Sequence, residues 1–494
     1  FHVKSRLKTI KKHLLFKTGE LASRTILIES ERNLRNQIYF ADAKIEIDSS
    51  SSHSVVTHVT VFDQWSSLPI VGLKRIGEQW ASRFGIKENN FLGTGQMISY
   101  SYYEDLSTKG STLGYFNSSF THNRLQLMLQ FTENTEGYHL SSLIRKPLIS
   151  KYDDNSFQIR YMVSKYSDWY YYDGNLLYSN NENNIDIGET NRLVEFKNIS
   201  KKSLYFDFTK SYGFDNKMNI RFFGKILEIN QDSNNSSLLN SEYTDYLPDD
   251  LTIPVRDDVL IGMEFQLYKI GYAQTKNLTN VKWTENLSRI KHFSFTLGRN
   301  ILGFGAKNNN FFLKWGVKYS DFFKDKHFVF ANSNLQYYLT PSGKKENGSY
   351  DANIRYQYKF TSLTNGKIST YWKNYIGRPS YEQLLLGEST GLYGYPNFYY
   401  SGGALLLINS ELTMITDIEI MTIIPAISIF ASTGNTFTDY NHVYLDNMHS
   451  SIGFGLRFGL SRSAGSIVNH INFSWPLDDS MEGPTISIHS KNSL

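Results

Sequence analysis

The sequence predicts a mainly β fold: a transmembrane antiparallel β-barrel of about 16 strands, preceded by a small N-terminal α+β domain. Segments of eight to ten residues alternate apolar and polar side chains over about 400 residues. Aromatic residues are abundant, with 34 Tyr and 33 Phe, whereas only 10 Pro interrupt the chain. Strands whose outer face meets lipid combine these features.

Composition narrows the functional classes. The 494 residues carry 51 Lys+Arg against 47 Asp+Glu, so no bulk basic field recruits nucleic acid, and we expect no nucleic-acid partner. The absence of Cys excludes disulfides, thiolate zinc sites and cysteine nucleophiles. No apolar run reaches the roughly 18 residues of a spanning helix. The chain begins at Phe1 without a charged and apolar leader, and we expect a processed or trimmed chain.

Residues 1–75 are predicted to form the N-terminal domain and residues 76–494 the barrel. Helices are expected over 8–16 and 20–37, because apolar residues there recur at helical spacing, and two alternating strands over 43–47 and 55–61. The exposed edge marked by Val55, Val59 and Val61 would accept an extended client by strand addition, or it only packs against the helices. The sequence leaves both alternatives open.

The barrel segments repeat one pattern. Outward-facing candidates such as Ile98, Tyr100 and Tyr102 are separated by Ser99 and Ser101. The same alternation appears in Leu125–Thr132, Leu204–Phe208 and Ile354–Phe360, where Arg355 and Lys359 join Arg221 and Lys225 as expected lumen charges. A soluble β-sandwich would end after roughly 100 residues, whereas a closed barrel explains the length and leaves no unpaired edge in lipid. The polar connectors 180–191 and 231–249 are candidate extracellular loops.

Ordered sequence fragments resemble the BamA/TamA superfamily of outer-membrane barrels with periplasmic POTRA domains. Residues 1–47 resemble a single POTRA domain, and Asn89-Asn90-Phe91-Leu92-Gly93-Thr94-Gly95 is similar to the start of the family's first barrel strand. The strongest similarities are Gly391-Leu392-Tyr393-Gly394-Tyr395-Pro396, Asn409-Ser410-Glu411-Leu412 and Gly453-Phe454-Gly455-Leu456-Arg457. The resemblance implies that Leu392, Tyr393, Gly394 and Tyr395 belong to a loop that folds back into the lumen.

Two charges of the family pattern are missing. Tyr393 stands where the family's inward loop usually has Arg, and Ser432 stands where a wall strand usually has an acidic residue. Losing only one of these charges would strand the other at a cost on the order of 3 kcal/mol, so loss of both is physically consistent. We expect either a neutral contact from the Tyr393 hydroxyl to Ser432, contributing about 1 kcal/mol, or aromatic packing alone.

The sequence contains little that indicates an enzyme. Gly387-Glu388-Ser389-Thr390-Gly391 matches a nucleophile-elbow pattern, but Gly394 and Pro396 follow where that motif needs a helix, which favours a chance match in a loop. The 12 His residues form no metal-binding spacing. We therefore expect no enzyme activity, no metal and no cofactor.

The resemblance implies assembly of outer-membrane proteins or translocation of secreted polypeptides. The mechanism would be a weak seam between a first strand containing Gln96, Ile98 and Tyr100 and a short last strand after Pro484, containing Ile486 and Ile488. Expected partners are unfolded barrel or secreted polypeptide clients, outer-membrane lipid or lipopolysaccharide, and periplasmic or lipoprotein factors. The expected location is the outer membrane of a Gram-negative bacterium, with the N-terminal domain in the periplasm. A dedicated transporter of one secreted partner and a passive pore are the alternatives.

Overall fold

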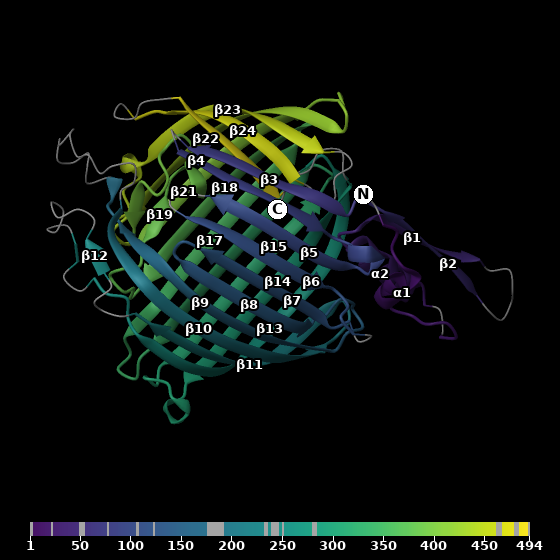
Figure 1. The fold of residues 1–494 in the computed structure, drawn as a ribbon, viewed down its shortest axis with the longest axis horizontal. Coiled ribbons are helices and arrows are strands. Elements are labelled where there is room, and N and C mark those ends of the chain that lie inside the picture. The colour runs from purple at the N-terminus through teal and green to yellow at the C-terminus, as the bar shows by residue number, and fades with distance from the viewer. Residues whose placement is uncertain are drawn as a thin grey trace.

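The computed structural model describes residues 3–20, 23–48, 55–76, 79–104, 108–121, 124–174, 192–231, 236–238, 247–248, 251–278, 284–460, 467–478 and 484–492. Most of them form one antiparallel β-barrel, and a small helical unit lies at one end of it (Figure 1). Among the described residues, no helix combines the length and apolar character needed to cross a membrane.

Twenty strands form the wall in the described part of the chain, so the prediction of about 16 strands was too low. They are β3 (Ser67–Ile76), β4 (Gln79–Glu88), β5 (Gln96–Glu104), β6 (Lys109–Asn117), β7 (Gln126–Asn134), β8 (Gly137–Lys146), β9 (Asn155–Tyr171), β10 (Arg192–Tyr212), β11 (Asn216–Asn230), β13 (Arg256–Lys276), β14 (Thr284–Asn300), β15 (Phe311–Phe323), β16 (His327–Leu339), β17 (Lys345–Lys359), β18 (Thr364–Ile376), β21 (Ala404–Ile415), β22 (Ile423–Phe437), β23 (His449–Leu460), β24 (Ile467–Pro476) and β25 (Thr485–Asn492). A short strand, β12 (Ser236–Leu238), pairs with the end of β10.

The wall is amphipathic in the way the sequence predicts. On β5, Tyr100 and Tyr102 are exposed on the outer surface, whereas Ser101 between them is buried. On β10, Leu204, Phe206 and Phe208 are likewise exposed while the intervening Asp207 is buried. An outward apolar band with an inward polar face is the arrangement of a transmembrane barrel.

Strand β3 corrects both the predicted domain boundary and the predicted seam. It begins at Ser67, so residues 67–75, which we placed in the N-terminal domain, belong to the wall. The sheet closes where β25 lies beside β3. Gln96, Ile98 and Tyr100 lie on β5, the third wall strand, whose neighbours are β4 and β6. They are therefore not seam residues, and residues 89–95 are the turn between β4 and β5 rather than the start of the barrel.

The connections at the two barrel ends differ in length. Strands β10 and β11 are joined at the end near the N-terminal unit by three residues, 213–215. At the opposite end, 20 residues separate β9 from β10 and 27 separate β18 from β21. The predicted extracellular loops 180–191 and 231–249 leave from strands at this opposite end, but 180–191 and most of 231–249 lie outside the described residues. The N-terminal unit thus marks the expected periplasmic end.

The N-terminal unit comprises α1 (Leu7–His13), α2 (Arg24–Arg35) and a hairpin of β1 (Phe40–Asp48) and β2 (Val56–Asp63). Leu34, Tyr39, Phe40 and Ala43 form its small core. These elements are the regular structure that the described residues give before the wall, and a POTRA domain is not evident from them. The second helix, predicted over 20–37, is shorter than expected at both ends, since α2 begins at Arg24 and ends at Arg35.

A buried histidine lies in this core. The Nε2 atom of His13 is 2.8 Å from the Tyr39 hydroxyl oxygen, and His13 is only 3% exposed. Burial, reinforced by the Lys12 ammonium, lowers the pKa of His13 to about 4 from its ordinary value of 6.5. Burial also raises the pKa of Tyr39. His13 is therefore neutral at physiological pH.

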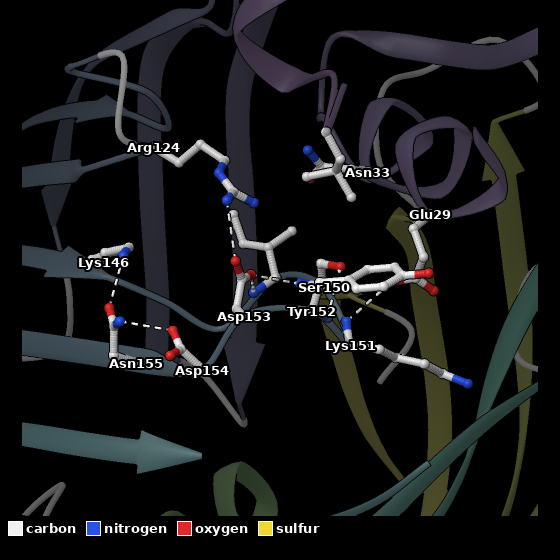
Figure 2. Close-up of polar contacts among 12 residues, drawn as sticks. Glu29, Asn33, Arg124, Lys146, Ser150, Lys151, Tyr152, Asp153, Asp154 and Asn155 are labelled. Carbon is white, nitrogen blue, oxygen red and sulfur yellow. Dashed lines mark hydrogen bonds and ion pairs between the residues drawn. The ribbon is translucent and has the colours of Figure 1, made fainter. Parts of the chain in front are cut away.

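The N-terminal unit is docked on the turns at the nearer end of the barrel. The Arg6 backbone N–H and the Thr9 hydroxyl both donate to the Gly93 carbonyl at 2.9 Å. Arg32 of α2 donates to the Ile149 carbonyl at 3.0 Å. Glu29, on the same helix, accepts a hydrogen bond from the Lys151 backbone N–H (Figure 2). Helices α1 and α2 therefore bind two different turns, which fixes the unit against the rim.

Candidate functional site

The connection between β18 and β21 is the central feature of the barrel interior. Residues 377–403 form a small hairpin of β19 (Leu384–Leu386) and β20 (Tyr400–Gly402), with a 3₁₀ turn, η4 (Glu388–Thr390), between them. A buried apolar cluster joins this segment, hereafter the lumen loop, to the inner face of β21; its members are Leu384, Leu386, Leu392, Tyr395, Tyr400, Leu405 and Leu407. The loop therefore packs inside the barrel, as the resemblance implies.

Turns and glycines shape the loop tip. Gly391 and Gly394 have φ of 112° and 90°, a backbone conformation that side-chain-bearing residues rarely adopt. The Glu388 carboxylate accepts a hydrogen bond from the Gly394 backbone N–H at 2.5 Å, which closes the tip on itself. The nucleophile-elbow pattern at 387–391 thus lies in this 3₁₀ turn, which no α-helix follows among the described loop residues.

Tyr393 contacts Ser432 through its backbone N–H and not through its hydroxyl, which was the predicted donor. The Tyr393 backbone N–H donates to Ser432 Oγ at 3.2 Å, and Ser432 Oγ lies 2.7 Å from Ser451 Oγ. The Tyr393 ring packs edge-on against Phe430, with centroids 5.1 Å apart. The predicted side-chain contact is thus replaced by a backbone hydrogen bond supplemented by aromatic packing. Neither sequence-based alternative describes this arrangement, because the contact comes from the backbone and aromatic packing does not act alone.

Tyr395 connects the lumen loop to the closing strands. Its hydroxyl oxygen lies 2.8 Å from both the Ser450 carbonyl oxygen and Asp478 Oδ2, so its one proton is shared between these two acceptors. Asp478 lies two residues after the end of β24, on the connection that leads to β25, and His449 Nδ1 lies 2.7 Å from the same carboxylate oxygen. Tyr400 stacks on the His449 ring at 4.1 Å. This cluster binds the loop to β23 and to the β24–β25 connection.

The other side of the loop reaches the far wall. Gln383 exchanges two hydrogen bonds of 2.8 Å with the backbone of Tyr171, the last residue of β9. The Ser401 backbone N–H donates to Asp173, and the Gly174 N–H donates to the Tyr399 carbonyl at 2.9 Å. Within the described wall, eight strands separate β9 from β21 in one direction and ten in the other. The loop therefore crosses the lumen.

A charge pair that the sequence reasoning missed lies beside the loop tip. Arg457 on β23 binds Glu411 on β21 through Nε at 3.1 Å and Nη2 at 2.8 Å, and its Nη1 donates to Asn472 at 2.7 Å. The Arg457 side chain is 6% exposed and that of Glu411 is 26% exposed. Both residues line the same polar cavity as Tyr393. In the sequence, both residues belong to motifs that carry the family resemblance, and opposite charges at two inward positions are the signal from which their pairing could be predicted.

The remaining predicted site residues have defined positions. Ile486 and Ile488 lie on β25, where they pair with Phe473 and Ile471, and Pro484 precedes that strand. These residues belong to the closing strand as predicted, and β25 has 8 residues where β13 has 21.

At the N-terminal hairpin, Val59 and Val61 face the small core from β2, whereas Val55 precedes the strand and is exposed. In the described sheet, β2 has β1 as its one partner strand. The side chains thus pack against the unit's core, while a main-chain edge is left for pairing.

Charged side chains line the lumen at the positions that the alternation predicts. Arg221 and Lys225, predicted to face inward, line one cavity with Glu264, and Arg221 binds Glu264 at 2.8 Å. Across the described residues, no three His, Asp or Glu side chains are grouped so as to hold a metal ion.

Searches of family models and of curated proteins give no match. Among solved structures, the chain is similar to CdiB from Escherichia coli, with 14% identity, a TM-score of 0.48, and coverage of 99% of this chain and 74% of that one. For CdiB from Acinetobacter baumannii the identity is 11%, the TM-score 0.47, and the coverage 99% and 71%. For BamA from Haemophilus ducreyi lacking POTRA domains 1–3, the values are 11%, 0.43, 99% and 82%. These values do not assign the chain to a family.

Proposed function

We propose that this chain is an outer-membrane protein that assembles barrel proteins or translocates polypeptides, and that it works by parting the wall between β3 and β25. The outward apolar band supports a place in a bilayer. The single observation that carries the proposal is the attachment of the lumen loop to the connection leading into β25, through Tyr395 and Asp478. A loop in this position holds the closing strand, and its release frees a strand edge.

A strand edge is the chemical basis of the activity. Backbone N–H and C=O groups at an open edge pair with an incoming strand of almost any sequence. Strand β25 suits this role because it is short and is preceded by Pro484, which cannot donate a hydrogen bond. Clients are then unfolded barrel strands or segments of secreted polypeptides. The N-terminal unit would act in the periplasm as a POTRA-like domain, with β2 offering a first edge to them.

The absence of Cys from the sequence makes the seam testable by engineered disulfides. Ile70 on β3 and Ser487 on β25 are both at inward positions, given their pairing with Gly85 and Asn472. We expect a Cys at 70, combined in turn with Cys at 485 and at 487, to yield a cross-linked barrel that loses client assembly and recovers it on reduction.

The matched control is a cross-link away from the seam. Asn332 and Asn353 are direct partners on β16 and β17, and both face the lumen. A Cys pair at these positions should leave client assembly unchanged. Full activity of a barrel locked at the β3–β25 seam would refute the seam mechanism.

Depletion followed by outer-membrane proteomics distinguishes the roles. A broad fall in barrel proteins indicates a general assembly factor. Loss of one exported protein indicates a dedicated transporter, the second candidate. An unchanged outer membrane would favour a passive pore and contradict the proposal.

A further inference from the structure

A second cavity inside the barrel, distinct from the one at the loop tip, has an unusual charge. Its volume is about 510 Å³, within the range of small-molecule sites. Five basic side chains line it, from β11, β13, β15 and β18: Arg221, Lys225, Arg256, Lys314 and Lys373. Only two carboxylates do so, Glu264 and Glu382. The whole chain, by contrast, has a net charge of only +4 among 98 charged residues, 51 basic and 47 acidic.

The two arginines are already neutralised. Arg221 Nη1 binds Glu264 at 2.8 Å, and Arg256 Nη2 binds Asp258 at 2.6 Å. Carboxylates held in this way have little capacity left to compensate the lysines. The acidic groups of the wall around the cavity are thus largely engaged.

The three lysines differ from the arginines. Within the described residues, Lys225, Lys314 and Lys373 form no hydrogen bond or ion pair, although Lys373 lies 5.3 Å from the Tyr375 ring centroid. Lys314 is level with Thr296 and Gln336, which are neutral. Lys373 is level with Asp351, a carboxylate that accepts a hydrogen bond from Asn334 at 3.0 Å. Asp258, which binds Arg256, is the acidic group near Lys225, and Glu382 is the one near Lys373, so these two carboxylates balance only part of the basic charge of the cavity.

Neutral donors complete the lining. Tyr205, Tyr338 and Tyr375 bring hydroxyl groups and Gln336 brings an amide. Ammonium groups surrounded by hydroxyl and amide donors suit an oxyanion with several acceptor oxygens, because charge-assisted hydrogen bonds to such oxygens are about twice as strong as neutral ones. A carboxylate or a halide offers fewer acceptors. The cavity therefore favours the phosphate class.

We propose that this cavity is a binding site for a small multivalent oxyanion of the phosphate or diphosphate class. Lys225 and Lys314 supply the charge, and the tyrosine hydroxyls and Gln336 supply neutral hydrogen bonds. The site lies toward the expected extracellular end, beneath the lumen loop, and it does not depend on the proposed parting of the wall. Glu382, which the loop contributes, is a tethered anion in the same cavity and competes with the ligand.

The experiment is isothermal titration calorimetry of the purified 494-residue chain in detergent with inorganic pyrophosphate. We expect saturable binding whose affinity falls roughly tenfold or more in the Lys225→Gln/Lys314→Gln double variant. The reason is that losing each charge-assisted hydrogen bond to pyrophosphate weakens binding by roughly several-fold or more. Glu382→Gln should bind pyrophosphate more tightly, because the competing carboxylate is gone. The two kinds of substitution each replace a charged side chain by an amide but should change the affinity for pyrophosphate in opposite directions. A general loss of structure would lower the affinity in both.

Lys202→Gln is the matched control, because it removes the same charge from the outer face of β10, where Lys202 meets Glu228. Its affinity for pyrophosphate should equal that of the unchanged chain. Folding of each variant is checked by heat-modifiable gel mobility, and if the double variant does not fold, Lys314→Gln and Glu382→Gln decide the matter. Absence of saturable binding, or equal affinity in the Lys314 and Glu382 variants and the unchanged chain, would overturn the proposal.

Discussion

Replacing Glu411 by Gln should destabilise the barrel more than replacing its partner Arg457 by Met. The two side chains form one ion pair, but their environments differ: Arg457 is 6% exposed, whereas Glu411 is 26% exposed and borders the polar cavity. A charge left alone in a buried position costs far more than one that water can reach. The asymmetry of burial therefore predicts an asymmetry of stability.

The expected loss in the free energy of unfolding depends on which charge each variant leaves without its partner. In Glu411→Gln, the buried guanidinium keeps the Asn472 amide oxygen at 2.7 Å and the Leu456 carbonyl at 3.2 Å, but no carboxylate, so we expect a loss of about 3 kcal/mol. In Arg457→Met, the partly hydrated Glu411 carboxylate loses a partner but no charge is sealed in, and we expect about 1 to 2 kcal/mol. The double variant should cost less than the sum of the two.

The assay is urea unfolding of the protein folded in lipid vesicles, followed by tryptophan fluorescence, from which the free energy of unfolding is obtained. Glu228→Gln, which breaks an exposed pair with Lys202 at 3.5 Å, is the control and should change stability by well under 1 kcal/mol. An Arg457→Met variant at least as unstable as Glu411→Gln, or strictly additive effects in the double variant, would refute the reasoning from burial.

Three further predictions concern the lumen loop and the N-terminal unit. Tyr395→Phe deletes the hydroxyl that binds Asp478, so the loop should loosen by about 1 kcal/mol and be cleaved faster in limited proteolysis; an unchanged cleavage rate would contradict the attachment. Ser432→Ala removes the acceptor of the Tyr393 N–H and should raise hydrogen exchange at that amide, whereas equal exchange would show that aromatic packing alone holds the tip. Because the folded pKa of His13 is depressed to about 4, the unfolded unit binds a proton that the folded unit excludes, and stability falls as the pH drops from about 6.5 toward 4. Between pH 7 and pH 5 the loss in the N-terminal unit should be about 2 kcal/mol by hydrogen exchange of the α1 amides, and His13→Gln should remove this pH dependence.

The alternation of side chains was sufficient to predict the barrel, and its failures have physical causes. Strands with a lipid face and a polar face, such as the one containing Phe206 and Asp207, were predicted correctly. Strand β3 was missed because its inward residues include Leu68 and Ile70, which are apolar like its outward Val71, so the period of two disappears. Pro69 and Gly72 further disguised it, since both are uncommon inside strands. The seam was consequently placed two strands too late.

The site was predicted in outline but not in its contacts. The resemblance indicated which residues form the lumen loop, because turn glycines such as Gly394 leave a local signature. The contact between Gln383 and Tyr171 joins residues 212 positions apart, and no local pattern encodes such a distance. The same holds for the contact between Tyr395 and Asp478. Whether the Tyr393 hydroxyl or its backbone N–H reaches Ser432 depends on a small rotation of the loop tip, which the sequence does not specify.

The lumen loop has a mechanical consequence for the whole ring. The loop connects the end of β9 to β21 and β23 across the lumen, and these attachments divide the barrel wall into two arcs of strands. The stiffened arc runs from β10 to β18. If the wall parts between β3 and β25 as proposed, we expect the strands of the other arc to move while those from β10 to β18 keep their positions.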